Sequence, residues 1–465
     1  MDVKGLLRTE QAEGFLAPES VSMLTMKMLK LGLLLLFLST LSGAESLLPP
    51  GAQTKVLENG LKVVVVPTDT KDLVALQIVM AVGSRNEVEE GKSGFAHFFE
   101  HLMFRGTKRY PPEQAEEMLK AAGVSSNAWT WDDQTVYHKV FLKEDLEAIL
   151  DYEADRFMNL EYQEPEFRTE ALAVLGEYNK NSANPTEKMY EVLQDTAFDV
   201  HTYEHTTMGF LEDIEQYPEG YDYSWTFFDR FYRPEYATLL MVGDLEPENA
   251  FQVVEQYFGA WQPGSYKAEL PVEPEQTEPR KAHIDWESST LPWVMVGYKA
   301  PPYSALDDTA AMQVWESLAF SQTGSLYQEL VLEEQIVDEF QPFFFLKKDV
   351  FLVGLAVRLT DPSKLDEVED RVIRAFESTK ELEITSQRLE DVKSRIRYSF
   401  LQGLDSPASI ASNLAFMLSL EPSLESIDDF YAAISRVTTD QLSEVAGSYF
   451  RPQGRTVVTL KSKES

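Results

Sequence analysis

The sequence predicts an α+β protein made of two homologous half-domains, and three observations support this. Strand-like apolar runs and patterns of helical period occur in mixed blocks, which is typical of an antiparallel or mixed sheet packed with helices. The segment AHFFEHLMF at residues 96–104 aligns with MQVWESLAF at residues 312–320, so a similar segment recurs 216 positions later. Between them, a stretch rich in proline and glutamate begins at Pro271 and indicates a linker. Chance similarity between two amphipathic helices is the alternative to duplication.

The predicted elements of the first half follow in order from residue 54. Asn59 and Gly60 lie between two strand-like runs, and this residue pair is favoured in tight hairpins. Farther along, apolar and alternating runs predict strands, and apolar residues three and four positions apart predict helices. The expected elements are strands at 74–82, 126–131 and 134–142, and helices at 94–104, 112–122 and within 144–181.

These patterns divide the chain of 465 residues into four parts. Residues 1–44 are expected to form an N-terminal extension and signal peptide, and residues 45–265 the first half. A linker is predicted at residues 266–285, and residues 286–465 form the second half as a duplicate of the first. The length is sufficient for two or three domains with buried cores.

Residues 26–44 have the three regions of a secretory signal peptide. Lys27 and Lys30 provide the positive start, residues 31–38 the apolar stretch, and Ala44 a small residue at the cleavage site. We therefore expect export, to the periplasm in a Gram-negative bacterium and otherwise into the medium. Cleavage after Ala44 would leave no stable membrane span, and an uncleaved anchor is the alternative.

The composition excludes several classes of function. The 41 Lys and Arg residues against 77 Asp and Glu residues give a net charge of −36, which repels nucleic acids and anionic lipids. Such a surface either keeps the protein soluble or steers cationic peptides toward it. The chain has no cysteine, so disulfides and thiol catalysis are excluded, and any metal must be held by histidines and carboxylates.

The strongest catalytic signal is the motif H-x-x-E-H, formed by His97, Glu100 and His101. Positions i and i+4 of a helix share a face, so the two imidazoles can bind one metal ion with Glu100 beside them. A catalytic zinc ion lowers the pKa of a water molecule, and a neighbouring carboxylate can accept the proton. The aligned positions of the second half carry Gln313 and Ser317, so only the first half retains these ligands.

Two histidines need a third protein ligand, and the residues alone leave its identity open. Aspartate and glutamate are abundant, and four other histidines compete for the role: His138, His201, His205 and His283. The run HTYEH at residues 201–205 lacks a suitable acidic partner. We expect a structural role there, or a role at the rim of the substrate site.

The segment GFAHFFEHLMFRGT resembles the inverted-motif zinc peptidases of the pitrilysin type, in particular the branch that contains the mitochondrial processing peptidase. The resemblance extends over nearly all of residues 50–460 and implies a processing-peptidase-like metallohydrolase fold with one Zn²⁺ per chain. In that family a glutamate about 76 residues after the second histidine completes the zinc shell, and Glu177 stands 76 residues after His101. Seven residues earlier, Glu170 matches a second family glutamate that supports the site, and the resemblance implies that it acts with the catalytic Glu100.

The run SSNAWTWDDQTVYHKV resembles the strand pair that follows the motif helix in this family. In relatives the edge strand binds the substrate as an added strand, so that backbone hydrogen bonds provide the affinity. Asn127, Ala128 and Thr130 are the substrate contacts that this resemblance implies. Core packing is the alternative for the nearby aromatic residues Trp129, Trp131 and Tyr137.

One departure from the family implies a partner chain. Members that act alone carry an Arg in the second half, and seven residues later a Tyr, that hold the substrate; Val331 and Asp338 align with these positions. Valine has no donor, and an ionised aspartate would repel an oxyanion. The resemblance therefore implies a heterodimer in which a sister chain supplies the Arg and Tyr. A shifted alignment, or replacement by another group such as Arg397 or Tyr398, is the alternative.

Together these observations predict an exported zinc metalloendopeptidase that hydrolyses unfolded or short peptides with metal-activated water. His97, His101 and Glu177 would bind the metal, and Glu100 would act as general base and proton shuttle. Peptides are the expected substrate, and no nucleic-acid partner is expected. The alternative function is a non-catalytic scaffold or assembly subunit with the same fold.

Overall fold

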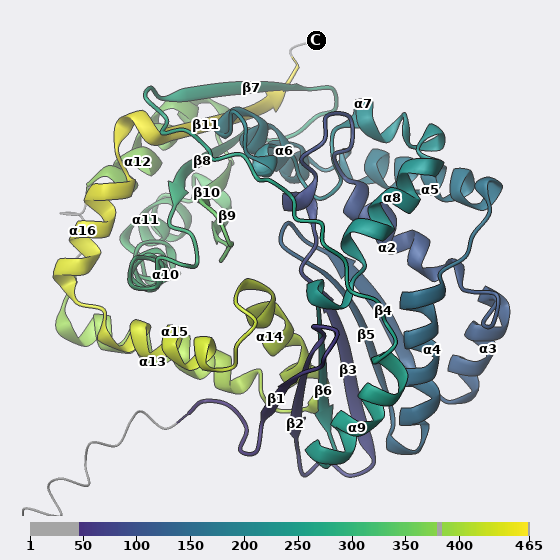
Figure 1. Ribbon diagram of the computed structural model, residues 1–465. Coiled ribbons are helices and arrows are strands. Elements are labelled where there is room, and N and C mark those ends of the chain that lie inside the picture. The colour runs from purple at the N-terminus through teal and green to yellow at the C-terminus, as the bar shows by residue number, and fades with distance from the viewer. Residues whose placement is uncertain (1–45, 379–383, 464–465) are drawn as a thin grey trace, which may run out of the picture. The chain divides into compact units, whose positions relative to one another are not determined.

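The computed structural model describes residues 46–378 and 384–463, which form two β-sheets with their helices (Figure 1). The predicted signal peptide at residues 26–44 lies outside the described residues. Within the described ranges, none of the helices has the length and apolar composition needed to cross a bilayer.

The first sheet has six strands in the order β1-β2-β6-β3-β5-β4, so β1 and β4 are its edges. Its strands are β1 (Gln53–Val56), β2 (Lys62–Pro67), β3 (Leu73–Met80), β4 (Ser125–Thr130), β5 (Thr135–Leu142) and β6 (Ala237–Gly243). The α-helices of this half are α2 (Phe95–Leu102), α3 (Pro112–Ala121), α4 (Leu146–Asn159), α5 (Glu164–Asn181), α6 (Pro185–Ala197), α7 (Leu211–Ile214), α8 (Tyr221–Phe231) and α9 (Pro247–Phe258).

The second sheet has five strands in the order β7-β11-β8-β10-β9. Its strands are β7 (Arg280–Trp286), β8 (Trp293–Ala300), β9 (Val337–Phe344), β10 (Phe351–Leu359) and β11 (Arg455–Ser462). The α-helices of this half are α10 (Leu306–Phe320), α11 (Ser325–Tyr327), α12 (Leu365–Glu377), α13 (Ser386–Gln402), α14 (Pro407–Leu420), α15 (Glu425–Arg436) and α16 (Thr439–Tyr449).

The two sheets have the same connectivity. In the first, β2 runs parallel to β6, and β6, β3, β5 and β4 follow as antiparallel neighbours. In the second, β7 runs parallel to β11, and β11, β8, β10 and β9 follow in the same way. Helices α2 and α10, which carry the recurring segment, are each the first α-helix after the corresponding strands β3 and β8. This correspondence confirms the predicted duplication, and β1 is an addition to the first sheet.

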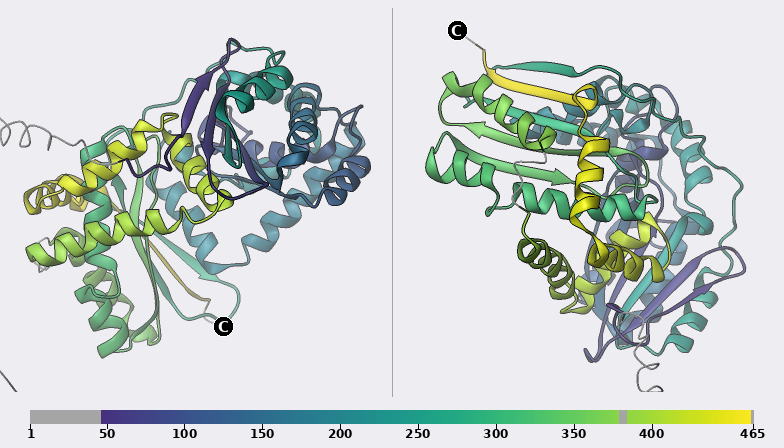
Figure 2. Two further views of the ribbon diagram at one scale, coloured as in Figure 1. Left: turned by 90° about the horizontal axis from the view of Figure 1, so that it is seen from below. Right: turned by 90° about the vertical axis from the view of Figure 1, so that its left-hand side faces the viewer.

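Each half places one helix on the sheet of the other half. Helix α6 packs on β11 and β7 of the second sheet, and α14 packs on β3 and β6 of the first (Figures 1 and 2). Leu193 of α6 approaches β8 closely: a Cβ atom at Gly297 would lie 3.3 Å from its side chain. On the other sheet, Gln77 of β3 donates a hydrogen bond to Ser412 of α14 over 3.0 Å. This exchange ties the halves together, and it leaves β3 and β6 of the first sheet and β8 and β11 of the second largely buried on both faces.

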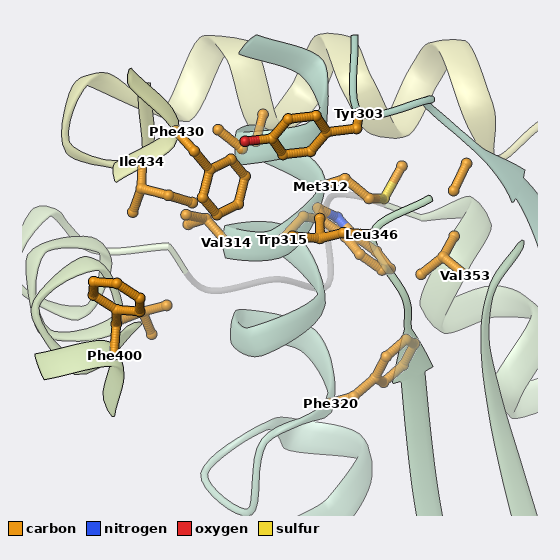
Figure 3. Packing of buried hydrophobic residues seen from close by; sticks show 14 of the residues in the cluster. Tyr303, Met312, Val314, Trp315, Phe320, Leu346, Val353, Phe400, Phe430 and Ile434 are labelled. Atoms are coloured by element: carbon orange, nitrogen blue, oxygen red, sulfur yellow. The ribbon is translucent and has the colours of Figure 1, made fainter. Parts of the chain in front are cut away.

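The core of the second half gathers around α10 (Figure 3). The Trp315 ring is fully buried, with its centroid 4.3 Å from that of Phe450 and 5.6 Å from that of Phe376. Val353 of β10 and Phe430 of α15 belong to the same cluster. Helix α10 is therefore held by its apolar face, whereas Gln313 and Ser317 are only partly buried.

The observed elements agree with those predicted from the sequence, with boundaries that differ by a few residues. β1 and β2 pair as an antiparallel hairpin, with Gly60 at a positive φ of 92° in the turn. Most of the predicted linker at residues 266–285 forms no helix or strand, but β7 begins within it at Arg280. The boundaries of the half-domains at residues 265 and 286 stay a prediction.

Candidate metal centre

The motif helix α2 is fixed at its N-terminus and along its apolar face. Both oxygens of the buried Glu87 carboxyl group accept backbone N–H groups, from Gly94 over 2.5 Å and from Ala96 over 2.6 Å, which satisfies donors that the start of a helix leaves unpaired. Burial raises the pKa of Glu87, and the two backbone hydrogen bonds oppose that rise. Position 94 requires glycine because φ is +77° and a Cβ atom would lie 2.2 Å from the carbonyl oxygen of Met208. The apolar residues Phe95, Phe98, Phe99 and Leu102 are buried.

The other face of α2 brings His97 and His101 together with Glu177 of α5. The centroids of the imidazole rings are 4.9 Å apart. One Glu177 oxygen lies 3.8 Å from Nε2 of His97 and 3.6 Å from Nε2 of His101. Among the described residues, these three side chains form the one group of His, Asp and Glu whose ligand atoms all lie within 4.8 Å of one another.

The donor set fits a zinc ion. Tetrahedral coordination with Zn–N and Zn–O bonds of about 2.0–2.2 Å separates ligand atoms by about 3.3–3.6 Å. The distances of 3.8 and 3.6 Å from Glu177 to the two imidazole nitrogens are close to this separation. Burial, and to a smaller extent the neighbouring His101, lowers the pKa of His97 to about 3. Its imidazole is therefore neutral at ordinary pH, which is the form that binds metal.

Glu170 lies behind one of the two imidazoles. Its Oε1 atom is 3.0 Å from Nδ1 of His101, and its other oxygen forms a salt bridge with Arg105. A carboxylate in this position orients the ring and raises its basicity toward a metal. The equivalent Nδ1 atom of His97 is buried and has no hydrogen-bond partner among the described residues.

Glu100 lies beside the ligands in a protected position. Its side chain is largely buried, and the hydroxyl of Thr130 donates a hydrogen bond to Oε2 over 2.6 Å. Burial raises the pKa of Glu100; the Thr130 hydrogen bond and His101 lower it, and Glu177 raises it. A carboxylate whose proton affinity is raised in this way is suited to accept and return a proton.

These side chains line a pocket of about 750 Å³. Edge strand β4 forms one wall, to which Asn127, Ala128 and Thr130 contribute. The aromatic residues near this strand differ from one another. Trp129 lines the pocket, whereas Tyr137 is buried and its hydroxyl lies 2.7 Å from that of Tyr232.

The pocket lining also contains residues that sequence reasoning did not single out. Glu187 and Glu191 of α6 line the pocket together with Tyr178, whose hydroxyl donates a hydrogen bond to Glu191. Glu191 also accepts a hydrogen bond from Lys188, and Glu187 is exposed. Two glutamates in a chain this acidic give no signal at the level of sequence.

The other histidines lie outside the metal-ligand cluster. His201 Nε2 is 3.2 Å from Asp349, and His205 is buried with Nδ1 3.0 Å from a backbone carbonyl. His283 Nδ1 lies 2.8 Å from the hydroxyl of Thr459.

The two positions at which the sequence departs from the family line a second pocket, in the second half. Val331 and Asp338 both border it, and Asp338 accepts two hydrogen bonds from Arg358, over 2.8 and 3.0 Å. Arg397 and Tyr398 are exposed on α13 and border neither pocket.

Imidazoles one helical turn apart that converge with a carboxylate from a later helix define a class of hydrolytic zinc centre. Two family models match the chain: "Insulinase (Peptidase family M16)" over residues 62–210 and "Peptidase M16 inactive domain" over residues 221–396. The chain belongs to peptidase family M16. The predicted family and α+β fold are thereby confirmed.

Relatives cover nearly the whole chain. The "Zinc protease PqqE" of Helicobacter pylori is 29% identical over an alignment of 447 positions, which covers 93% of this chain and 98% of that protein. The "Probable mitochondrial-processing peptidase subunit beta" of Schizosaccharomyces pombe is 25% identical over 410 residues, 85% of this chain and 88% of that protein. A crystal structure of a protease from Helicobacter pylori superposes with a TM-score of 0.82 at 27% identity, covering 89% of this chain and all of that one.

Proposed function

We propose that this chain is an exported zinc metalloendopeptidase that hydrolyses unfolded or short peptides, with one Zn²⁺ per chain. The convergence of His97, His101 and Glu177 beside Glu100 carries the proposal. The zinc proteases among its relatives support it, as does the predicted signal peptide at residues 26–44.

Each side chain of the centre has a distinct role. His97, His101 and Glu177 would hold Zn²⁺, which supplies a Lewis acid that polarises a carbonyl and makes water more acidic. Glu100 accepts a proton from the attacking water at its carboxylate and delivers it to the leaving amine. Thr130 holds that carboxylate in place through its hydrogen bond.

The substrate would bind along β4. Because β4 is an edge strand of the first sheet, an extended peptide can add to it through backbone hydrogen bonds. Asn127 and Ala128 would contact the substrate, whereas the Thr130 hydroxyl is occupied by Glu100. Such binding suits unfolded segments of many sequences.

The charge of the pocket favours substrates with a basic side chain. Glu187 lines the pocket and is exposed, and Glu191 near it is paired with Lys188. Arg105, the basic residue of the pocket lining, is paired with Glu170. The net charge of −36 would attract cationic peptides over a longer range.

A sister chain that supplies an Arg and a Tyr is the proposed partner. Valine at position 331 has no donor, and the carboxylate of Asp338 is paired with Arg358, so neither can stabilise an oxyanion. The named relative from Schizosaccharomyces pombe is a subunit of a processing peptidase. If the purified chain alone cleaves peptides at full rate, with no gain from such a partner, this part of the proposal fails.

Replacement of Glu100 by Gln tests the catalytic assignment. The purified wild-type chain and the E100Q variant should contain the same amount of zinc, while the variant loses about two or more orders of magnitude in the rate of cleavage of an unfolded protein substrate. Substantial turnover by E100Q would refute the role of Glu100. The scaffold alternative predicts no zinc-dependent cleavage by either protein.

A further inference from the structure

The second half contains a counterpart of the metal centre in which the charges are inverted. Helices α10 and α13 contact each other as α2 and α5 do. Glu170 and Glu177 are seven residues apart on α5, and Arg388 and Arg395 are seven residues apart on α13. Basic residues thus replace acidic residues on the corresponding helix.

These arginines contact the corresponding part of α10, but they donate to backbone carbonyls, whereas the glutamates contact the imidazole side chains of α2. Glu177 approaches His101, and Arg395 donates a hydrogen bond over 3.4 Å to the carbonyl oxygen of Ser317, the counterpart of His101. Arg388 donates to the carbonyl oxygen of Leu318, one residue farther along α10, over 2.8 Å. The alignment of the two helix pairs therefore rests on geometry as well as on spacing.

A pocket of about 550 Å³ opens at this place. Phe320 at the end of α10, the residues that follow it and the edge strand β9 line this pocket, and α2 and the edge strand β4 line the pocket of the metal centre. Val331 and Phe340 supply apolar surface, and Arg395 supplies a cation. The pocket thus combines one positive charge with an apolar wall.

The positive charge of Arg395 is not neutralised by a salt bridge. No carboxylate among residues 46–378 and 384–463 forms one with it. Asp338, which also borders the pocket, is paired with Arg358. Glu316, the counterpart of Glu100, accepts a hydrogen bond from Ser317 and interacts with Arg395 only at longer range.

We propose that this pocket binds a peptide carboxylate through Arg395, with an apolar neighbouring group against Val331 and Phe340. A guanidinium offers two parallel N–H donors to the two oxygens of a carboxylate. The carboxylate is either the C-terminus of the peptide or an acidic side chain. The choice of a peptide rests on the proposed function, whereas the pairing of Arg395 with a carboxylate does not.

A binding experiment on the full chain tests this pocket without relying on cleavage. In the zinc-loaded E100Q background, fluorescence anisotropy would measure the affinities of two pairs of labelled peptides. One pair has the same sequence with a free C-terminus or a C-terminal amide, and the other pair differs only by Asp or Asn at one position. At least one carboxylate-bearing peptide should bind about fivefold more tightly than its neutral counterpart, as expected for a partly exposed charge pair. A difference between the free C-terminus and its amide identifies a C-terminal carboxylate as the ligand. A difference between the Asp and Asn peptides identifies the carboxylate of an acidic side chain.

Variants of two arginines separate this pocket from general charge effects. R395Q should abolish the preference for the carboxylate, R395K should retain part of it, and R374Q, at an exposed position of α12 outside the pocket, should leave it unchanged. A preference that survives in R395Q, or that is absent with Arg395 in place, overturns the proposal. If wild-type chain fails to cleave peptides yet the Arg395-dependent preference is present, the proposed function fails and this inference stands.

Discussion

The Nδ1 atom of His101 lies 3.0 Å from Oε1 of Glu170, so the imidazole that offers Nε2 to a metal is held from behind by a carboxylate. The same carboxylate is paired with Arg105. Arg105 thereby helps to fix the position of Glu170. We therefore propose that Glu170 supports a metal ligand and that Glu100 transfers the proton.

Replacement of Glu170 by Gln should therefore weaken zinc binding by about 10- to 100-fold, the usual effect of losing a partner of a ligating histidine. Competition with a chromogenic chelator measures the affinity. E164Q is the matched control, because Glu164 is on the same helix and is exposed in a pair with Arg168. Equal zinc affinity in E170Q and E164Q would show that the contact with His101 does not support the metal.

Replacement of Glu187 by Gln should raise KM for peptides with an Arg or Lys near the cleaved bond by about three- to fivefold, because an exposed charge pair in the pocket is lost. Peptides with norleucine at that position should be cleaved as before. The exposed Glu215 provides the control variant E215Q, since it lies outside the pocket. A KM that changes equally for both peptides would contradict a role in charge recognition.

Acid should destabilise the fold in part through Asp349, which joins the two halves. Burial raises the pKa of this carboxyl, but hydrogen bonds from His201 and Arg85 outweigh burial and lower it. A carboxylate whose pKa is lower in the folded than in the unfolded state stabilises the fold above the unfolded pKa of about 3.9. This stabilisation is lost as pH falls below that value. The free energy of unfolding of D349N should fall less steeply than that of wild type between about pH 4 and pH 2.

Urea unfolding at a series of pH values measures this difference. The control is D370N, because Asp370 is exposed on α12. Curves of the same steepness for wild type and D349N would contradict the linkage.

Much of the fold and the centre of the site were predictable from local sequence. Three of these features depend only on residues that are close together in the sequence: the histidines at positions i and i+4, the hairpin at Asn59 and Gly60, and the periodic apolar patterns. The recurring segment at residues 96–104 and 312–320 indicated two halves, and the identical sheet connectivity confirms them. Glu177 came from the family resemblance, because one more glutamate on an acidic helix carries no local signal.

The remaining features depend on packing between distant parts of the chain. No local pattern indicates that α6 and α14 pack on each other's sheets, since an amphipathic helix does not specify which sheet it covers. The contacts of Glu87 with the start of α2 and of Arg105 with Glu170 depend in the same way on tertiary structure. The replacement of an acidic residue by Arg395 also depends on tertiary structure, because it follows from the correspondence of helices α10 and α13 with α2 and α5.

The zinc content of the purified full chain tests the central claim most directly. After dialysis against a weak chelator, wild type should retain about one zinc ion per chain, and E177Q should retain almost none because one of three protein ligands is lost. E166Q, with its substitution in the first turn of the same helix, should retain as much as wild type. Equal zinc content in wild type and E177Q, or no zinc in wild type, would contradict the account.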